Sequence, residues 1–302
     1  MSVDVRPFRR SDREQVTALV NAHAAAVVPG LSASVNAVMT QLEGEPGEFI
    51  VDPWVSERLT LVAEQRDRVT AAAHLLRYAG DERVSESYRG VGDIRWFLFW
   101  PPAPYWPDSE DAADALLAAC VSQLDRWGVT RRYADVTLPV PAVYGVPEQL
   151  PHIRAAYERA GFVEGNRIEI LYLADVGDLP RPSKPPIEGL ELRRSLGVNG
   201  TRFTAVLGDE VVGFIEVEAL AEPRRLPRQE GWADIGNLEV VETYRLRGVA
   251  TWLLGAAAEW LRLAGIDRLI GYATPGDDHV AFFDHTPGFR VLTRTSRAWE
   301  RG

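Results

Sequence analysis

The stretch from Leu238 to Leu254 has the residue types that bind a phosphate group. Gly248 and Ala250 carry little or no side chain, Arg245 and Arg247 carry positive charge, and a long apolar segment follows. Where a helix begins, unpaired backbone N–H groups and the positive end of the helix dipole bind phosphate oxygens, provided that no side chain blocks their approach. The pattern therefore predicts a pyrophosphate site at a strand-to-helix turn.

The hydrophobic pattern of the second half predicts the elements that position this turn. Strand-type alternation, helix-type spacing and glycine-marked turns follow one another in a mixed α/β order. We expect strands at 190–194, 202–207, 211–219, 235–241, 268–273 and 290–299, and helices at 247–263 and 279–285. Only residues 195–201 separate the first two strands, so no helix fits between them.

The residues of the turn also form a known motif. Arg245-Leu246-Arg247-Gly248-Val249-Ala250 matches in full the Gln/Arg-x-x-Gly-x-Gly/Ala pattern that follows the fourth strand of GCN5-related N-acetyltransferases (GNAT). The strand before the motif and the helix after it are the context that supports it. With Gly288-Phe289 further on, the sequence resembles this family over most of the range Arg202 to Trp299.

The resemblance implies that acetyl-CoA is the cofactor, with its pyrophosphate on the loop and its pantetheine arm beside a splayed pair of central strands. The residues placed at the cofactor in this way are Val240, Val241, Arg245, Leu246, Arg247, Gly248, Val249, Ala250 and Thr251. If no cofactor binds, Gly248 serves only the close packing of the helix on the sheet.

Transfer of an acetyl group to an amine needs a free lone pair, so a base or a water chain must first remove the ammonium proton. The resemblance implies a carboxylate on the fourth strand, where Asp234 and Glu239 are the candidates. Their spacing gives them opposite parity along a strand, so we expect only one of them to face the site. Either can equally be a solvated acid at the strand edge.

The family often places a tyrosine on its last helix, shortly before Gly-Phe, to protonate the departing thiolate. Aligned through Gly288-Phe289, that position holds Asp284 in the second half, whereas the first half has Tyr157. An ordinary aspartate is ionised at neutral pH, so Asp284 acts as an acid only if burial raises its pKa. Otherwise His285 or a water molecule takes this role.

The first half of the chain repeats the same order of elements. The two halves end in corresponding segments, Tyr157-Glu-Arg-Ala-Gly-Phe-Val and Asp284-His-Thr-Pro-Gly-Phe-Arg. This similarity indicates an internal duplication. The proline-rich segment 175–189 has no apolar periodicity and is expected to be a linker. We therefore expect two tandem GNAT-like domains of the α/β (α+β) class, at 1–174 and 190–302, each a mixed, mostly antiparallel sheet flanked by helices.

The strand-to-helix junction of the first half, from Trp100 to Glu110, differs from that of the second. It has no glycine, four prolines that donate no backbone N–H, and the bulky rings of Tyr105 and Trp106. We expect that the first domain has lost coenzyme binding and that it supports the second domain or shapes the acceptor site.

Composition excludes several other functions. The chain of 302 residues has a net charge of -10 with its arginines scattered among acids, which argues against a nucleic-acid partner. Cys120 is the only cysteine, so we expect no disulfide framework and no metal site. There is no signal-peptide pattern and no run of 18 apolar residues, so we expect a cytoplasmic protein without a membrane partner.

Together these features predict an N-acetyltransferase that moves an acetyl group from acetyl-CoA to a primary amine of a small molecule or peptide. The two-domain plan is similar to that of mycothiol synthases, although no acceptor signature links the chain to them. The alternative is an acyl-CoA-binding sensor or scaffold without turnover, which Asp284 at the tyrosine position favours. Transfer of a longer acyl group stays open, and the chain is expected to act as a monomer or homodimer.

Overall fold

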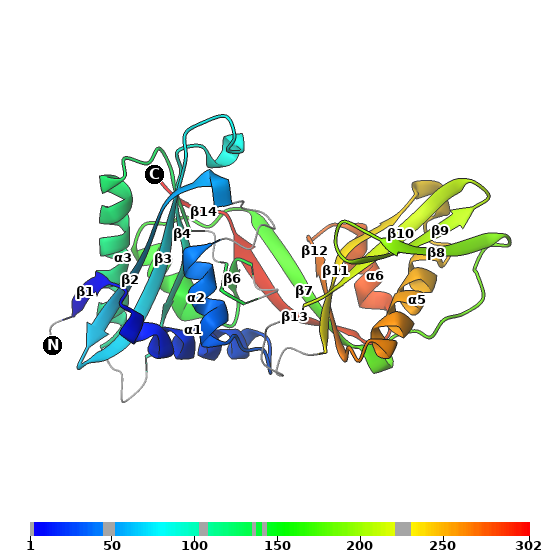
Figure 1. Ribbon diagram of the computed structural model, residues 1–302, viewed down its shortest axis with the longest axis horizontal. Helices are drawn as coiled ribbons and strands as arrows, with labels where there is room; N and C mark the ends of the chain where they lie inside the picture. The colour runs from blue at the N-terminus through cyan, green and yellow to red at the C-terminus, as the bar shows by residue number, and fades with distance from the viewer. Residues whose placement is uncertain (1–2, 45–51, 103–107, 135–136, 141–143, 221–230) are drawn as a thin grey trace. The chain divides into compact units, whose positions relative to one another are not determined.

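The computed structural model describes residues 3–44, 52–102, 108–134, 137–140, 144–220 and 231–302. The chain forms two compact units (Figure 1). Unit 1 consists of Met1–Ile168 and Arg294–Gly302, and unit 2 consists of Glu169–Thr293. The chain therefore passes between the units twice. No helix in the described ranges is both long and apolar enough to span a membrane.

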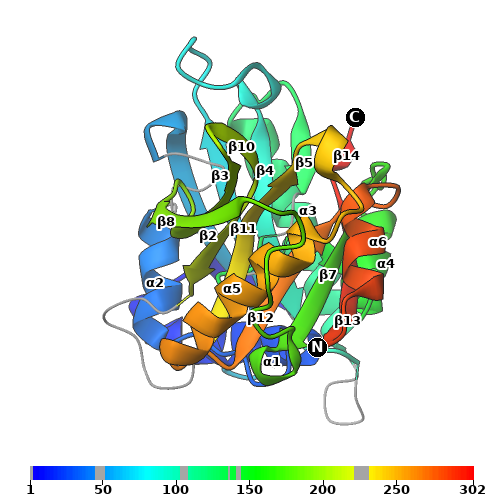
Figure 2. The same cartoon turned by 90° about the vertical axis from the view of Figure 1, so that its right-hand side faces the viewer.

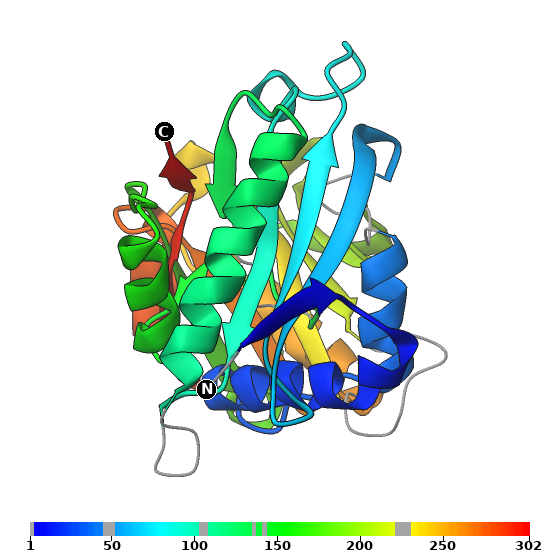
Figure 3. The same ribbon diagram turned by 90° about the vertical axis from the view of Figure 1, so that its left-hand side faces the viewer.

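Unit 1 is built on one sheet with the strand order β1-β2-β3-β4-β5-β14. Neighbouring strands are antiparallel except β4 and β5, which are parallel. The strands of this unit are β1 (Asp4–Pro7), β2 (Val55–Gln65), β3 (Arg68–Tyr78), β4 (Gly92–Phe99), β5 (Arg132–Ala134), the short β6 (Val146–Pro147) and β14 (Trp299–Arg301). Its helices are α1 (Arg13–Val27), α2 (Val35–Glu43), α3 (Ser109–Arg126) and α4 (Pro151–Arg159). Helix α3 packs along β2, β3 and β4 (Figure 3).

Unit 2 repeats this arrangement without the first two helices. Its sheet has the strand order β6-β13-β7-β12-β11-β10-β9-β8, in which the short β6 of unit 1 pairs with the end of β13. From β7 to β8, β11 and β12 pair in parallel and the other neighbours are antiparallel. The strands are β7 (Arg167–Asp175), β8 (Leu190–Leu196), β9 (Thr201–Leu207), β10 (Glu210–Ala219), β11 (Trp232–Val240), β12 (Arg268–Ala273) and β13 (Phe289–Arg297). The helices are α5 (Val249–Leu263) and α6 (Asp278–His285). The expected tandem of mixed, mostly antiparallel sheets is confirmed.

Helix α5 provides the core of unit 2. It packs against β9, β10 and β11 (Figure 2), and its buried side chains include Leu253, Leu254 and Leu261. Strands β8 and β9 form a hairpin over their whole length, as the short connection between them predicts. The long apolar helix α5 therefore covers most of this face, and Phe283 of α6 packs into the same core.

The two units exchange their closing strands, which moves the domain boundaries away from those expected at 174 and 190. Strand β7 precedes the proline-rich segment, yet it pairs with β12 in unit 2 from Ile170 to Asp175. The single strand expected at 290–299 is broken at Ala298, whose φ of 61° turns the backbone into the left-handed region. The last residues then form β14, which pairs with β5 in unit 1.

The proline-rich segment 175–189 is a strap along α5 rather than a free linker. The Arg262 guanidinium donates to the Leu179 carbonyl at 2.7 Å near the end of α5, and the Trp252 indole donates to the Ser183 carbonyl at 3.1 Å near its start. Gly255 permits the close approach, because a Cβ there would lie 3.0 Å from the Arg181 carbonyl oxygen. The strap therefore runs antiparallel to α5 and belongs to unit 2.

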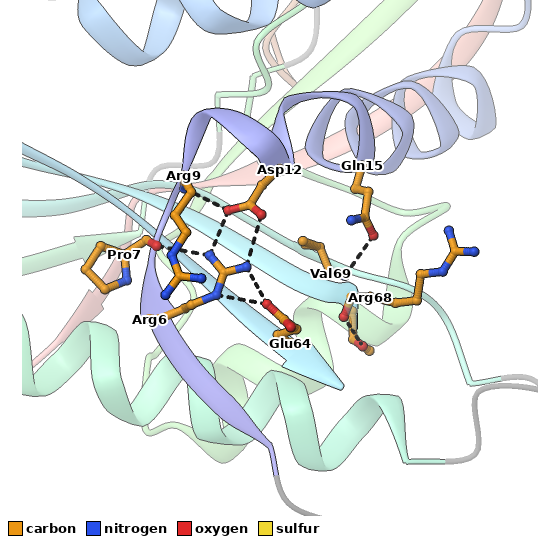
Figure 4. Close-up of polar contacts among 9 residues, drawn as sticks. Arg6, Pro7, Arg9, Asp12, Gln15, Glu64, Arg68 and Val69 are labelled. Atoms are coloured by element: carbon orange, nitrogen blue, oxygen red, sulfur yellow. Dashed lines mark hydrogen bonds and ion pairs between the residues drawn. The ribbon is translucent and has the colours of Figure 1, made fainter. Parts of the chain in front are cut away.

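An arginine at the edge of unit 1 joins β1, β2 and the 3-10 helix η1 (Arg10–Asp12) (Figure 4). Arg6 on β1 donates to both carboxylate oxygens of Asp12, at 2.7 and 3.0 Å, and its Nε donates to Glu64 of β2 at 2.9 Å. The Arg9 backbone N–H also donates to Asp12. Burial opposes the charge of Asp12, but the bonds from Arg6 and Arg9 and the Arg6 charge hold the pKa of Asp12 below its usual value.

We expect Arg6→Ala to destabilise the protein by about 3 kcal/mol, because it leaves the nearly buried Asp12 carboxylate without its charged partner. A folded-state pKa below the unfolded value means that this contribution is present above the unfolded pKa and is lost as the pH falls through the folded one. Thermal unfolding at pH 7 and at falling pH should show the difference from wild type shrinking. Arg83→Ala, which removes an exposed pair with Asp81, is the control and should leave the Tm unchanged.

The strand exchange predicts that neither half folds alone at the boundaries expected from the sequence. A fragment Ile187–Gly302 lacks β7, so β12 loses the neighbour that pairs with all six of its residues, and the exposed edge promotes aggregation. Size-exclusion chromatography should show aggregates. A monomeric fragment 187–302 with a cooperative melt would show that β7 is dispensable.

Candidate functional site

Strand β11 carries an extra residue that changes which side chains share a face. Its register with β10 shifts between Asn237 and Ile235, so Gly236 is a β-bulge. Leu238 and Ile235 lie opposite Ile215 and Val217, on the face that packs against α5. The side chains on either side of the bulge thus keep one apolar face in spite of the shift.

The bulge places Asp234 and Glu239 on one face, which corrects the expectation that their parity separates them. In the register with β10, Asp234 lies opposite Glu218 and Glu239 lies opposite Phe214, both on the face away from α5. The extra residue between them restores the same parity. Asp234 is buried, with 8% of its surface exposed, whereas Glu239 is exposed.

The pairing of β11 with β12 ends early. Only three pairs form, the last between Asp234 and Ile270, although β11 continues to Val240 and β12 to Ala273. Beyond this point Leu238 and Val240 turn their backbone groups away from β10. Their carbonyls accept from side chains instead: His279 Nε2 donates to Leu238 O at 2.8 Å, and Arg245 Nε donates to Val240 O at 3.1 Å.

The turn between β11 and α5 presents a run of unpaired backbone donors. The Arg245 N–H donates to Glu242 O at 3.1 Å, and the Trp252 N–H donates to Gly248 O at 3.0 Å. Within the part of the chain that the structure describes, no acceptor takes the six N–H groups from Leu246 to Thr251, and no side chain caps the helix. Such a group of donors at the positive end of a 15-residue helix suits a phosphate.

The backbone of this turn is held in an unusual conformation. Gly248, the residue before α5, has a φ of 81°, which favours glycine, and Leu246 has a φ of 58° with a fully exposed side chain. A bulky residue in the left-handed region is uncommon and marks a position that the surrounding structure maintains. Val241 is partly exposed beside the turn, and Val249 is buried beneath it.

The two arginines of the motif have different surroundings. Arg245 forms an ion pair with Asp278 at 2.6 Å, in addition to its bond to Val240 O. Arg247 lies with its guanidinium carbon 5.8 Å from the centre of the Tyr244 ring. Arg247 therefore keeps its charge available near the free N–H groups, whereas Asp278 offsets the charge of Arg245.

Asp284 lies on α6 and is exposed, so the burial that would make it a proton donor is absent. It accepts a hydrogen bond of 2.9 Å from the hydroxyl of Tyr172, a buried residue on β7. The sequence alone does not point to Tyr172, because the expected bounds 1–174 assign it to the first domain and no strand is predicted there. His285 bonds to the Ala281 carbonyl within its own helix.

Unit 1 offers a different environment at the corresponding place. Beside β4, the rings of Phe97 and Phe99 are fully buried, and Tyr157 packs between Phe97 and Trp299 at centroid distances of 5.7 and 5.9 Å. The Thr137 N–H also donates to the Arg95 carbonyl of β4 at 2.7 Å. Aromatic side chains thus fill the space next to this strand. The expected junction residues Tyr105 and Trp106 lie outside the described residues.

Comparison with known proteins agrees with this geometry. Residues 170–289 match the acetyltransferase (GNAT) family, a range that runs from β7 to the start of β13. This match identifies residues 170–289 as a GNAT-type domain. No curated protein matches the sequence.

Three solved structures share the fold along 99% of this chain. One is the GCN5-related glucosamine N-acetyltransferase region of a fungal multi-domain GH3 beta-N-acetylglucosaminidase, with a TM-score of 0.64 and 13% identity, of which the chain spans only 38%. A tandem GNAT protein from the clavulanic acid biosynthesis pathway has a TM-score of 0.64, 14% identity and 98% coverage. A GNAT from Sphaerobacter thermophilus has a TM-score of 0.61, 13% identity and 95% coverage. These likenesses extend over both units and show a tandem GNAT fold.

We expect Gly248→Glu to weaken coenzyme A binding more than tenfold, because it places bulk and negative charge at the unpaired N–H groups. A Cβ at this position would lie 3.4 Å from Pro186, an ordinary contact, but a φ of 81° also strains any other residue. Isothermal titration with coenzyme A measures the loss.

The matched control for this variant is Gly265→Glu, at the other end of the same helix. Gly265 has a φ of 73° and open space around its Cα, so the backbone strain is similar while the donors at the start of α5 stay free. Equal affinity losses in the two variants would show that strain, rather than blocked phosphate binding, causes the effect.

Proposed function

We propose that this chain transfers an acetyl group from acetyl-CoA to a primary amine of a small molecule or peptide, in a complex that holds both substrates. The observation that carries the proposal is the run of unpaired N–H groups from Leu246 to Thr251 at the start of α5. It follows directly on the segment where β11 no longer pairs with β12. A diphosphate at the turn and an extended arm along β11 fit these two features.

The fit of coenzyme A is supported by the sterics of the turn. Gly248 has no side chain, Leu246 turns its side chain fully into solvent, and Arg247 adds a charge that no carboxylate offsets among the described residues. Val240, Val241, Ala250 and Thr251 complete the surface around the turn. Bound acetyl-CoA supplies a thioester as the acetyl donor.

Asp234 is the better candidate for the base that removes the ammonium proton. It lies at the last pair between β11 and β12, where the two strands separate, and it is largely buried. Glu239 shares its face but is exposed near the end of β11. A carboxylate out of solvent exerts a stronger influence on a nearby ammonium group, which favours Asp234.

The proton that the coenzyme sulfur takes up needs a source. Asp284 occupies the position of the family's tyrosine and accepts the hydroxyl proton of Tyr172 in a hydrogen bond. The Tyr172 hydroxyl is the proposed donor: it gives its proton to the sulfur and regains one from solvent, and Asp284 orients it. In this hydrogen bond Asp284 is the acceptor, so the hydroxyl of Tyr172 carries the proton.

One structural relative guides the choice of acceptor amines to test. The fungal region of similar fold is described as a glucosamine N-acetyltransferase. Amino sugars therefore belong in the amine panel beside polyamines, amino acids and peptides with a free amine. The acidic face that holds Asp234, Glu218 and Glu239 suits a cationic acceptor.

A binding protein without turnover is the second candidate. The aspartate at position 284 favours it, because no titratable tyrosine stands there on α6. Release of free thiol from acetyl-CoA across the amine panel separates the two functions. A sensor binds acetyl-CoA and releases no thiol above the rate without an amine.

If Asp234 is the base, Asp234→Asn should lower kcat at neutral pH about 100-fold, and the loss should shrink at high pH, where more of the amine is already unprotonated. Affinity for coenzyme A should stay within about twofold, since the phosphate site is untouched. Steady-state thiol release from pH 6 to pH 10 gives the profile.

Glu218→Gln is the control, because Glu218 lies directly opposite Asp234 on β10 but is exposed. It should leave the pH profile of kcat unchanged, and any loss of charge on the acidic face should appear as a higher KM for a cationic acceptor. If kcat falls about 100-fold in Glu239→Gln and stays normal in Asp234→Asn, Glu239 and not Asp234 is the base.

A further inference from the structure

The strap of residues 175–189 runs along α5 and reaches the turn between β11 and α5. Ser183 accepts from the Trp252 indole in the first turn of α5, and Pro186 lies against Gly248, at 3.4 Å from the position of a Cβ there. Both contacts lie within unit 2. The residues between these two contacts are therefore held beside the start of the helix.

Lys184 is one of these residues, and it is the only lysine in the sequence. Its side chain is exposed, and no carboxylate among the described residues forms an ion pair with it. The rest of the positive charge of the chain is carried by arginine. A single lysine, with a flexible and compact ammonium group, thus sits in the part of the strap that is fixed at the phosphate-binding turn.

The carboxylates near the turn pair with other residues and do not neutralise the positive charge of Lys184. Asp278 offsets Arg245 at 2.6 Å, while Arg247 faces the Tyr244 ring, whose hydroxyl donates to Glu210 at 3.1 Å. The helix dipole and the six free N–H groups add further positive potential at the start of α5. Positive groups that gather without a partner repel one another, and an anion among them removes the repulsion.

We propose that Lys184 of the strap is a coenzyme-binding residue whose ammonium group contacts a phosphate of coenzyme A at the start of α5. This inference rests on the proposed function. It assigns the proline-rich segment a direct part in the site: the contacts of Ser183 and Pro186 fix the strap, and Lys184 reaches the ligand from it. The phosphate is either the diphosphate or the 3′-phosphate, since both carry the same chemistry.

The single lysine allows a direct test on the wild-type protein. Acylation of Lys184 by an N-hydroxysuccinimide ester is followed by peptide mass spectrometry, alone and with saturating coenzyme A, dephospho-coenzyme A or pantetheine. We expect coenzyme A to slow the reaction about fivefold or more, as for an amine engaged in an ion pair. Pantetheine, which has no phosphate, should give no protection.

Protection by both coenzymes identifies the diphosphate as the contact, and protection by coenzyme A alone identifies the 3′-phosphate. Either result supports the inference. Unchanged labelling of Lys184 in a protein that titration shows to be saturated with coenzyme A overturns it.

Affinity provides an independent measurement. Lys184→Gln should weaken coenzyme A binding about fivefold, more at low salt than at high salt, and Lys184→Arg should retain binding. Arg181→Gln is the matched control, because Arg181 lies on the same strap but pairs with Glu259 toward the other end of α5. Equal affinities of Lys184→Gln and wild type contradict the inference and leave the proposed function intact. A wild-type protein that binds no coenzyme A refutes both.

Discussion

Strand β12 stays in the sheet of unit 2 because β7 pairs with it along its whole length. All six residues of β12 have a partner on β7, whereas only three have one on β11. Because β7 holds β12 in the sheet, the end of β11 can separate from β12 while β12 stays in the unit. The exposed backbone of β11, the turn that follows it and the start of α5 all take their positions from this arrangement. A strand that precedes the proline-rich segment thus maintains the site that follows this segment.

The site combines a backbone in a fixed conformation with side chains that bind the β11 carbonyls and that a ligand can displace. The six N–H groups are fixed by α5 and by the left-handed conformations of Leu246 and Gly248. In contrast, His279 and Arg245 bind the two carbonyls of β11 through side chains that can rotate away. A ligand that runs along β11 exchanges one set of hydrogen bonds for another, so its net gain per bond is small. The phosphate contacts, which replace no protein partner, therefore contribute most of the affinity.

The sequence predicts the elements of unit 2 and the turn well, because both depend on local signals. The apolar spacing of α5 and the motif around Gly248 specify a helix start within a few residues. Three features escape such signals. The bulge at Gly236 places Asp234 and Glu239 on one face, the chain reversal at Ala298 sends β14 to another sheet, and the prolines of the strap give no sign of the helix on which they lie. Each depends on pairing between residues that are distant in sequence, which periodicity does not reveal.

The exchange of β14 also affects how the chain folds during its synthesis. Trp299 is completely buried in unit 1 beside Tyr157, and β14 borders β5, which is made some 165 residues earlier. At roughly 5 to 20 residues per second, the ribosome needs on the order of ten seconds or more to synthesise β14 after β5. During that interval the nascent first unit has an open sheet edge and a cavity in place of the indole. Folding of unit 1 is therefore completed only after Trp299 has emerged, and a chain that stops short of Trp299 leaves this unit unfinished.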